Sequence, residues 1–370
     1  MFQLRRLLLV FALLACALAS AAGPLPLPEA GRLTVYFLDV GQGDASLIVS
    51  PTGRTVLVDG GPPDAARSLV QRLGEVVQGP LDLVLLTHPH LDHLGGLTEV
   101  LARFGARRYL DPGFDHPSSA YRQLLEAVAA HEIQYVEPLL GEDGEPVTIG
   151  LGGGASLTVL WPRRPGQAFL SGTRSDANAN SIVFRLSYGE TSFLFTGDAE
   201  ADTENLLLRS GQDLRASVLK VAHHGSRHSS QAPFLTRVKP EAAVISCAAG
   251  NEYRHPHGKA LQRLQAVGAR VFRTDISGDI VAVSDGKSLR LDTVSPPSEM
   301  PSRVEATAST GPPPLERLPN PPGYSASRRS EVFHLADCPN VQQIQPGNLL
   351  RFGERADAAK GRRPAKDCNP

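Results

Sequence analysis

Cysteine is scarce in this chain: there are four in 370 residues, and one of them, Cys16, lies close to the start. So few cysteines exclude a disulfide-stapled scaffold, although an exported protein can still form one bridge. Net charge is also low, at −1 for the whole chain and −4 over residues 31–295, where 25 Lys and Arg stand against 29 Asp and Glu. This balance argues against a large non-specific nucleic-acid surface on that part. After residue 22 no segment is apolar enough to span a bilayer.

Residues 1–22 have the composition of a targeting segment. Arg5 and Arg6 supply a positive start, and the apolar stretch Leu7–Ala19 has signal-peptide length and ends among small residues that suit cleavage. We therefore expect a signal peptide and export, to the periplasm or the outside of the cell. A lipoprotein cleavage site with Cys16 lipidated is the alternative, but a bulky leucine two residues earlier disfavours it.

The rest of the chain divides into three parts. Hydrophobic residues make up 41% and charged residues 20% of the sequence, as in ordinary globular proteins. Over residues 31–295 short β-rich runs alternate with helical patterns, which predicts an α/β domain built as an αββα sandwich. Residues 296–327 are rich in Pro, Ser and Thr, which predicts a semi-extended linker. Residues 328–370 are expected to form a small α+β module.

The most informative stretch runs from His88 to His93, with the sequence His-Pro-His-Leu-Asp-His. It follows the apolar run 82–87, which is of buried-strand type, so it is expected in a loop at a strand end. His88 and His90 can point their imidazoles at one cation, while Asp92 and His93 can hold a second beside it. Imidazole and carboxylate are the ligands of hydrolytic zinc or manganese sites. The alternative is a solvated histidine-rich loop without a role.

This pattern, H-x-H-x-D-H, resembles the signature of the metallo-β-lactamase fold superfamily. The resemblance implies two divalent cations, zinc or manganese, that activate water at the ends of the strands. Asp198, which follows the strand-like run Ser192–Phe195, would bridge the cations with one oxygen on each. Asp59, which follows the run Thr55–Val58, would buttress the histidine loop without binding metal.

Histidines elsewhere in the chain would complete the two sites that the resemblance implies. One of the pair His223 and His224 should bind the second cation; strand register slightly favours His224, and the other would lie behind the ligands or touch substrate. In many relatives a third histidine binds the first cation. The candidates are His116, in a polar loop, and His131, which lies at a helix end and is expected on the surface.

The run Asp39–Ala45, with the sequence D-V-G-Q-G-D-A, resembles the hydrolase domain of ComEC-type competence proteins. The N-x-x-S element at Asn178–Ser181, the H-H-G-S segment at 223–226 and the run Tyr253–Pro256 are similar too. The resemblance covers about residues 33–285 in matching order. The membrane channel portion of those proteins is not in this sequence, so we expect a free-standing, exported hydrolase.

Further residues are assigned to the surroundings of the cations. Those expected to touch substrate or to support the ligands are Asp39, Gln42, Asp44, Asp59 and Ser226. For Asp39 and Asp44 the simpler alternative is that they only cap turns. His255 is the candidate for donating to a phosphate oxygen or protonating a leaving group, with Asp92 as the other catalytic residue.

The tail resembles the small metal-binding module of Ada-type DNA repair proteins, on the strength of His334, Cys338 and Cys368. That pattern usually closes with a C-x-x-C pair, but here the first position is Ala365. A Cys338–Cys368 disulfide is therefore favoured over a zinc site, given the missing ligand and the oxidising compartment. The tail is modestly basic, which suggests DNA or surface-polymer binding; a solvated face is the alternative.

Together these features predict an exported dinuclear-metal phosphodiesterase or nuclease acting on nucleic acid, linked to the processing or uptake of extracellular DNA. Many β-lactamases place a cysteine where Asp198 lies, which favours phosphoesters over β-lactams. Two alternatives remain open: a phosphodiesterase of cell-wall or lipid head groups, and a surface-binding protein with a vestigial site. The sequence does not give the oligomeric state.

Overall fold

The computed structural model of the chain describes residues 23–137, 148–162 and 168–294 and four short strands of the tail. The chain forms two compact units, Met1–Ser302 and Arg303–Pro370. The expected signal peptide, with Cys16, and the expected disulfide partners Cys338 and Cys368 lie outside the described residues. Among the residues that are described, no helix is long and apolar enough to cross a bilayer.

The first unit contains an eight-stranded sheet, which is antiparallel at one end and parallel at the other. The parallel strands follow β3 and are joined to one another through helices. The strands in spatial order are β15 (Leu289–Thr293), β14 (Ile280–Ser284), β1 (Leu33–Phe37), β2 (Ser46–Val49), β3 (Thr55–Val58), β4 (Leu83–Leu85), β5 (Arg108–Leu110) and β6 (Gln134–Val136).

A seven-stranded sheet packs against the first and is mixed in the same way. Its strands in spatial order are β13 (Arg270–Arg273), β12 (Ala242–Ile245), β11 (Val218–Lys220), β10 (Thr191–Phe195), β9 (Val183–Tyr188), β8 (Ala155–Trp161) and β7 (Thr148–Gly152). The pairings from β10 to β13 are parallel, and those from β7 to β10 are antiparallel.

Alternating side chains on β1 show how the layers are held together. Val35 and Phe37 point into the core between the sheets, whereas Tyr36 belongs to the core beneath the outer helices. Successive strand residues face opposite sides, so a strand that is buried throughout must be covered on both faces. The prediction of an αββα sandwich is confirmed.

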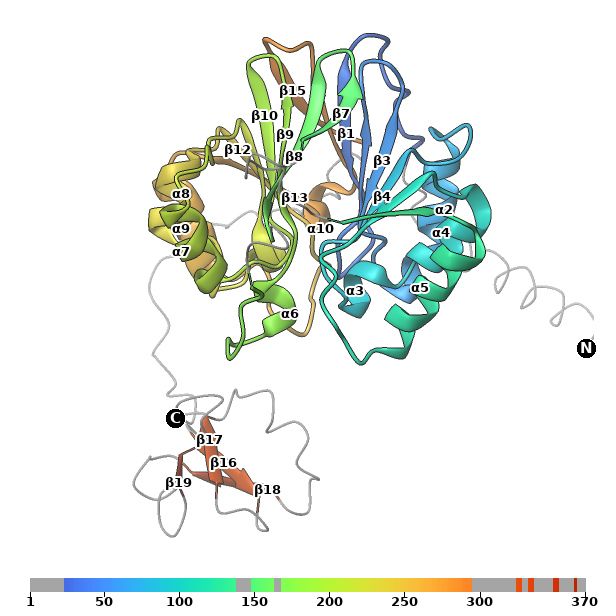
Figure 1. The fold of residues 1–370 in the computed structure, drawn as a ribbon. Coiled ribbons are helices and arrows are strands. Elements are labelled where there is room, and N and C mark those ends of the chain that lie inside the picture. Colours follow the sequence, from blue (N-terminus) through green and yellow to red (C-terminus); the bar gives the residue numbers. More distant parts are fainter. Residues whose placement is uncertain are drawn as a thin grey trace, which may run out of the picture. The chain divides into compact units, whose positions relative to one another are not determined.

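Helices cover both outer faces of the sandwich, as Figure 1 shows. The first sheet carries α2 (Ala66–Gly74), α4 (Leu97–Phe104) and α5 (Ser119–Ala130), and the second carries α7 (Ala201–Arg209), α8 (Ala232–Val238) and α9 (Gly258–Ala266). Short turns of helix lie in the connections: η1 (Pro63–Ala65), α3 (Leu91–Leu94), α6 (Asp176–Ala179), η2 (Ala222–Gly225) and α10 (Thr274–Ser277).

The second unit contains a four-stranded sheet of order β18 (Leu349–Phe352), β16 (Tyr324–Ser327), β17 (Val332–Leu335) and β19 (Arg363–Pro364). β16 occupies the last four residues of the segment predicted as a linker. His334 lies on β17, and its side chain is outside the described part. The α+β module and its disulfide therefore stay predictions.

Candidate metal centre

Two pairs of parallel strands, one pair in each sheet, carry the main residues of the candidate centre at their carboxyl ends. Asp59 follows β3 and His88 closely follows β4, both in the first sheet. Asp198 follows β10 and His224 follows β11, both in the second sheet. The carboxyl ends of neighbouring parallel strands meet at one edge of a sheet, which brings residues that are distant in sequence together.

The histidine loop turns from strand to helix within a few residues. His88 and His93 are fully buried, and α3 begins at Leu91, directly after His90. The Nε2 atom of His88 lies 3.0 Å from Nδ1 of His90. The short helix then turns Asp92 and His93 towards the second sheet, where they meet His224.

Asp92, His93 and His224 form one group of ligand atoms that could hold a cation. Oδ2 of Asp92 lies 3.2 Å from Nε2 of His224 and 3.9 Å from Nε2 of His93. Oδ1 of Asp198 closes the set, at 3.3 Å from His93 Nε2 and 3.8 Å from His224 Nε2. Ligands at zinc bond lengths in a tetrahedron are separated by roughly 3.3 Å, so these four atoms fit one divalent ion.

The other oxygen of Asp198 faces a different pair of histidines. Its Oδ2 lies 3.8 Å from Nε2 of His88 and 3.6 Å from Nε2 of His223. The two oxygens of one carboxylate are thus shared between two sets of imidazoles. A carboxylate that bridges two ions needs this arrangement.

Unsatisfied atoms support the fit of a cation. Nε2 of His93 and Oδ1 of Asp198 are buried and have no hydrogen-bond partner within the described residues. Orphaned buried polar atoms are rare and cost roughly 1–3 kcal/mol each. The Nδ1 of His93 is engaged by Asp59, so the Nε2 lone pair is free to bind an ion.

Supporting hydrogen bonds fix the tautomers of three histidines. Nδ1 of His93 lies 2.9 Å from Oδ2 of Asp59. Nδ1 of His224 lies 3.0 Å from the backbone oxygen of Ser246, which can only accept. Nδ1 of His223 lies 3.1 Å from Oε1 of Glu200. Each Nδ1–H therefore donates outward, and each Nε2 presents a lone pair to the centre.

Asp59, to which the family resemblance gave a buttressing role, accepts hydrogen bonds from the histidine loop on both carboxylate oxygens. Its Oδ1 accepts from the backbone N–H of Thr87 at 2.7 Å, and its Oδ2 accepts from Thr87 Oγ1 at 2.8 Å and from His93. The carboxylate is completely engaged at the rear of the histidine loop. It fixes both the strand end and the ring of His93.

Backbone strain marks the turn that carries the histidine pair. His223 and His224 both have left-handed conformations, with φ of 51° and 53°. Such a conformation costs a non-glycine residue roughly 1–2 kcal/mol. It persists because the turn is tied down: the N–H of His223 donates to Gly197 O at 3.1 Å, and the N–H of Ser226 donates to His223 O at 2.8 Å. Strain of this kind is characteristic of functional sites.

The carboxylates remain ionised in this environment. Burial alone would raise the pKa of Asp198, but His223, His93 and His224 surround it and hold its pKa well below the ordinary value. Burial likewise opposes the charge on His93, yet Asp198, Asp59 and Asp92 raise its pKa well above normal. The carboxylates thus create a negative environment in which a bound cation would take the place of protons.

Two charged residues that the sequence analysis did not single out support the centre. Glu200 is buried and joins His223 to Arg174, whose Nε lies 3.3 Å from Glu200 Oε1. Burial opposes its ionisation, but the hydrogen bond from His223 and the nearby Arg174 lower its pKa. In the sequence Glu200 is only an acid at the start of a helix, a common and uninformative position.

The second of these supporting residues is Lys220, which forms a buried ion pair with Asp44. Its Nζ lies 2.7 Å from Oδ1 of Asp44, and both residues are buried. The pair links β11 to the loop after β1, behind His224, whose Nδ1 is 3.7 Å from the same oxygen. Asp44, Asp59 and His93 also lie close enough together to suggest an ion site. Both carboxylates are already engaged there, so we assign them supporting roles.

A cavity of about 320 Å³ opens onto the centre. Its lining combines polar side chains that carry oxygen or nitrogen atoms with the large hydrophobic side chains of Leu91 and Tyr253. Its lining residues are Gln42, His90, Leu91, Asp92, Asn178, Asp198, His223, His224, Tyr253 and His255. Gln42 and His255, which the sequence analysis assigned to substrate contact or catalysis, are among these lining residues. Leu91, Asn178 and Tyr253 had been given no role.

Other predicted residues lie outside this lining. The ring of His116 is centred 5.8 Å from that of His90, but His116 belongs to none of the ion-holding groups found among the described residues. Asp39 is exposed, and its Oδ1 accepts from the N–H of Gly41 at 3.1 Å. Ser226 is buried, and its Oγ accepts from the N–H of His228 at 3.2 Å. Asp39 and Ser226 therefore shape loops rather than line the cavity.

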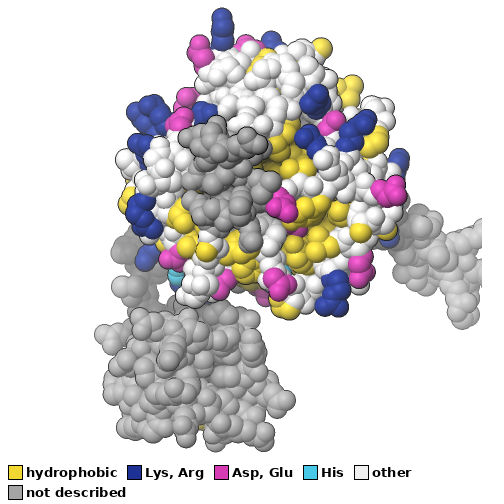
Figure 2. All heavy atoms as spheres, in the orientation of Figure 1, with side chains coloured by type: hydrophobic (Ala, Val, Ile, Leu, Met, Phe, Trp, Pro, Cys, Tyr) yellow, Lys and Arg dark blue, Asp and Glu magenta, His cyan; other side chains and the backbone are white. Residues whose placement is uncertain are grey.

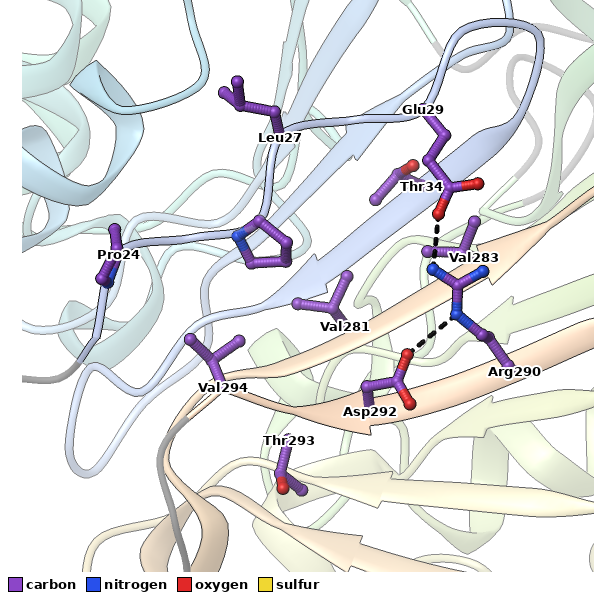
Figure 3. A pocket seen from close by; sticks show the side chains of 11 residues that line it. Pro24, Leu27, Glu29, Thr34, Val281, Val283, Arg290, Asp292, Thr293 and Val294 are labelled. Atoms are coloured by element: carbon purple, nitrogen blue, oxygen red, sulfur yellow. Dashed lines mark hydrogen bonds and ion pairs between the residues drawn. The ribbon is translucent and has the colours of Figure 1, made fainter.

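A second cavity of about 320 Å³ lies beside β14 and β15. Figure 3 shows that its charged groups already satisfy one another. Arg290 pairs with Glu29 at 2.5 Å and with Asp292 at 2.9 Å. None of the candidate ligands lines this second cavity. The cavity at the strand ends is therefore the candidate active site.

Comparison with known proteins agrees with this geometry. Residues 38–249 match the family model of the Metallo-beta-lactamase superfamily, and the chain belongs to this superfamily of metal-dependent hydrolases. The resemblance inferred from the histidine motif is confirmed. The Ada-like resemblance of the tail stays a prediction.

The chain is also similar to two longer curated proteins. ComE operon protein 3 of Bacillus subtilis (strain 168) is 32% identical over 268 residues, which are 66% of this chain and 32% of that protein. Recombination protein 2 of Haemophilus influenzae is 30% identical over 251 residues, which are 66% of this chain and 28% of that protein. The chain therefore spans about a third of the length of these relatives.

Among solved structures, the metallo-β-lactamase fold protein YhfI from Bacillus subtilis is similar to this chain at 12% identity, with a TM-score of 0.42. The match covers 70% of this chain and 100% of that one. It is a likeness of fold alone.

Proposed function

We propose that this protein is an exported phosphodiesterase that hydrolyses nucleic acid with two divalent cations. The observation that carries the proposal is the carboxylate of Asp198, whose two oxygens face separate sets of imidazoles. Export rests on the composition of residues 1–22. The name of one curated relative, Recombination protein 2, supports a substrate of the nucleic-acid class.

Each cation has a defined set of candidate ligands. His88, His90, His223 and Oδ2 of Asp198 would hold the first, and Asp92, His93, His224 and Oδ1 of Asp198 the second. His223 thus takes the part that the sequence analysis gave to His116. Imidazoles with carboxylates suit zinc or manganese, and such ions supply Lewis acidity that polarises a phosphoryl oxygen and acidifies water.

The remaining polar side chains of the cavity would orient the phosphodiester. Burial, together with the nearby His224 and His223, lowers the pKa of His255 to about 4, so its ring is neutral at pH 7 and keeps one N–H donor. Its Nδ1 has no partner within the described residues. A neutral imidazole there can donate to a phosphoryl oxygen or pass a proton to the leaving group.

Asn178 adds an amide to the same cavity. It is buried, and its Oδ1 has no hydrogen-bond partner in the part of the chain that the structure describes. Its Nδ2 lies 3.4 Å from Nδ1 of His223, but that nitrogen already carries a proton directed at Glu200. Two donors cannot satisfy each other, so the amide of Asn178 is available to substrate. Gln42 has its Oε1 on the N–H of Ala248 at 3.3 Å, which leaves its amide N–H groups to donate.

The surface charge is compatible with a small, local substrate contact. Figure 2 shows basic and acidic side chains interspersed on the face drawn. Recognition of a polyanion would therefore depend on the centre itself or on the modestly basic tail, 328–370, which we propose as an accessory DNA- or polymer-binding module.

The test is hydrolysis of bis-p-nitrophenyl phosphate by the purified protein with added Mn²⁺ or Zn²⁺. We expect metal-dependent turnover that falls on the order of 100-fold or more in Asp198→Asn. Asp213→Asn, which alters an exposed carboxylate, is the matched control. No turnover in a protein shown to hold two ions would contradict the proposal and direct attention to acyl substrates.

A further inference from the structure

Hydrophobic side chains are exposed at the mouth of the candidate active site. The described part of the chain has five exposed large hydrophobic residues, Leu27, Leu91, Tyr135, Tyr253 and Ile276. Two of these, Tyr253 at 60% and Leu91 at 51% exposure, line the cavity at the metal centre. Exposed apolar side chains that gather at a binding cavity indicate contact with a ligand.

The ring of Tyr253 ends a column of three stacked rings. His224, a candidate ligand, stacks on His255 with ring centres 6.1 Å apart and planes 29° apart. His255 stacks in turn on Tyr253, at 5.8 Å and 27°. The column leads from the metal centre to solvent. His255 covers one face of Tyr253, and the exposure of the residue leaves area for a further planar group.

The loop beneath this column is fixed by Asn251. Its Oδ1 accepts from the N–H of His255 at 2.9 Å, and its Nδ2 donates to the backbone oxygens of Ala248 and His255 at 2.8 and 2.5 Å. The backbone on both sides of Tyr253 is therefore held in place before a ligand arrives. A pre-positioned aromatic ring loses little entropy on binding.

We propose that Tyr253, together with Leu91 in the lining of the same cavity, forms a subsite for the nucleobase next to the scissile phosphodiester. This rests on the proposed function and makes it more specific, because it names nucleosides rather than lipid or cell-wall head groups as the group recognised. A nucleobase has a flat π-face that can continue the column. Glycerol and sugar head groups have none, and a single open tyrosine is no cage for choline.

The experiment compares two ligands that differ only in the base. Thymidine 5′-monophosphate and 2-deoxyribose 5-phosphate are titrated into the metal-loaded protein by calorimetry, which requires no turnover. We expect the nucleotide to bind about tenfold more tightly. Tyr253→Ala should abolish the difference by weakening only the nucleotide, and Tyr253→Phe should retain it. Ile276→Ala, which removes an exposed hydrophobic side chain outside the cavity, should change neither affinity.

Equal binding of the two ligands by the unaltered protein would overturn the subsite, as would a base preference that survives in Tyr253→Ala. Turnover of bis-p-nitrophenyl phosphate without any base preference would refute this inference and leave the proposed function standing. A base preference in a protein without phosphodiesterase turnover would support the subsite and refute the hydrolytic function.

Discussion

Replacing Glu200 should lower the affinity of the protein for one of the two proposed ions and leave its affinity for the other unchanged. Glu200 contacts His223 through a 3.1 Å hydrogen bond, and the described contacts join it to no ligand of the second group. In Glu200→Ala the ring of His223 loses the acceptor that fixes its tautomer and orientation. The set formed by Asp92, His93 and His224 keeps its own supports, Asp59 and Ser246.

The magnitude follows from the partners involved. Removing a carboxylate that orients a metal-bound histidine costs about 10- to 100-fold in affinity, or about 1.4 to 2.8 kcal/mol. The released guanidinium of Arg174 is 55% exposed in its side chain, so water can solvate it at little cost. Glu200→Gln should be milder, because the amide oxygen can still accept from Nδ1–H of His223.

The assay is a metal titration by equilibrium dialysis with metal analysis. We expect two ions per chain in the unaltered protein, with one dissociation constant raised and the other unchanged in Glu200→Ala. Glu99→Gln, an exposed acid in the first turn of α4, is the control. An equal loss of affinity for both ions would refute the assignment of His223 to the first site. Unchanged affinity for both ions would refute it as well. Thermal melting without metal identifies a general folding defect.

Three further outcomes are expected. Lys220→Met leaves the buried carboxylate of Asp44 unpaired and should lower the free energy of unfolding by about 3–5 kcal/mol in urea titrations. Adding Asp44→Asn to this variant should restore part of the lost stability, and a double variant without any recovery would contradict the stabilising ion pair. Burial raises the pKa of Glu204 to about 7, so the folded state holds a proton that the unfolded state releases above pH 4.5. The free energy of unfolding should therefore fall between pH 4.5 and 7, and it should fall more in the unaltered protein than in Glu204→Gln. Parallel pH profiles for the two proteins would refute this expectation. Removing metal with a chelator should lower Tm, by an amount equivalent to about 2.7 kcal/mol for each bound ion at a metal concentration 100 times its Kd. This shift should be smaller in Asp198→Asn, and an equal shift in both proteins would contradict binding by Asp198.

The strands and ligands that could be predicted share a local signal. The runs Val56–Val58 and Leu83–Leu86 are apolar and are followed directly by polar residues. The strands β3, Thr55–Val58, and β4, Leu83–Leu85, form there. A ligand that follows a strand inherits its position from the strand, so the motif and the fold predict each other. This is why the αββα sandwich and the histidine loop could be inferred together.

Other elements lack such a local signal or depend on pairing between distant segments. β6, Gln134–Val136, is mostly exposed and shows no apolar alternation. β14, Ile280–Ser284, is apolar, but its place beside β1 results from a pairing across most of the first unit. Glu200, Lys220 and Tyr253 acquire their roles only from tertiary partners: a histidine, an aspartate and a ring column. No residue-by-residue pattern distinguishes them from ordinary helix, strand and loop residues.

The histidine pair shows how tertiary contacts resolve an ambiguity that sequence leaves open. His223 and His224 are adjacent and share a left-handed backbone, so local structure does not rank them. Their Nδ1 partners differ, since Glu200 lies behind one and Ser246 behind the other. With these supports both Nε2 atoms approach Asp198, each near a different oxygen. One turn can therefore supply a ligand to each of the two proposed ions, and our proposal for the first ion needs no separate histidine such as His116.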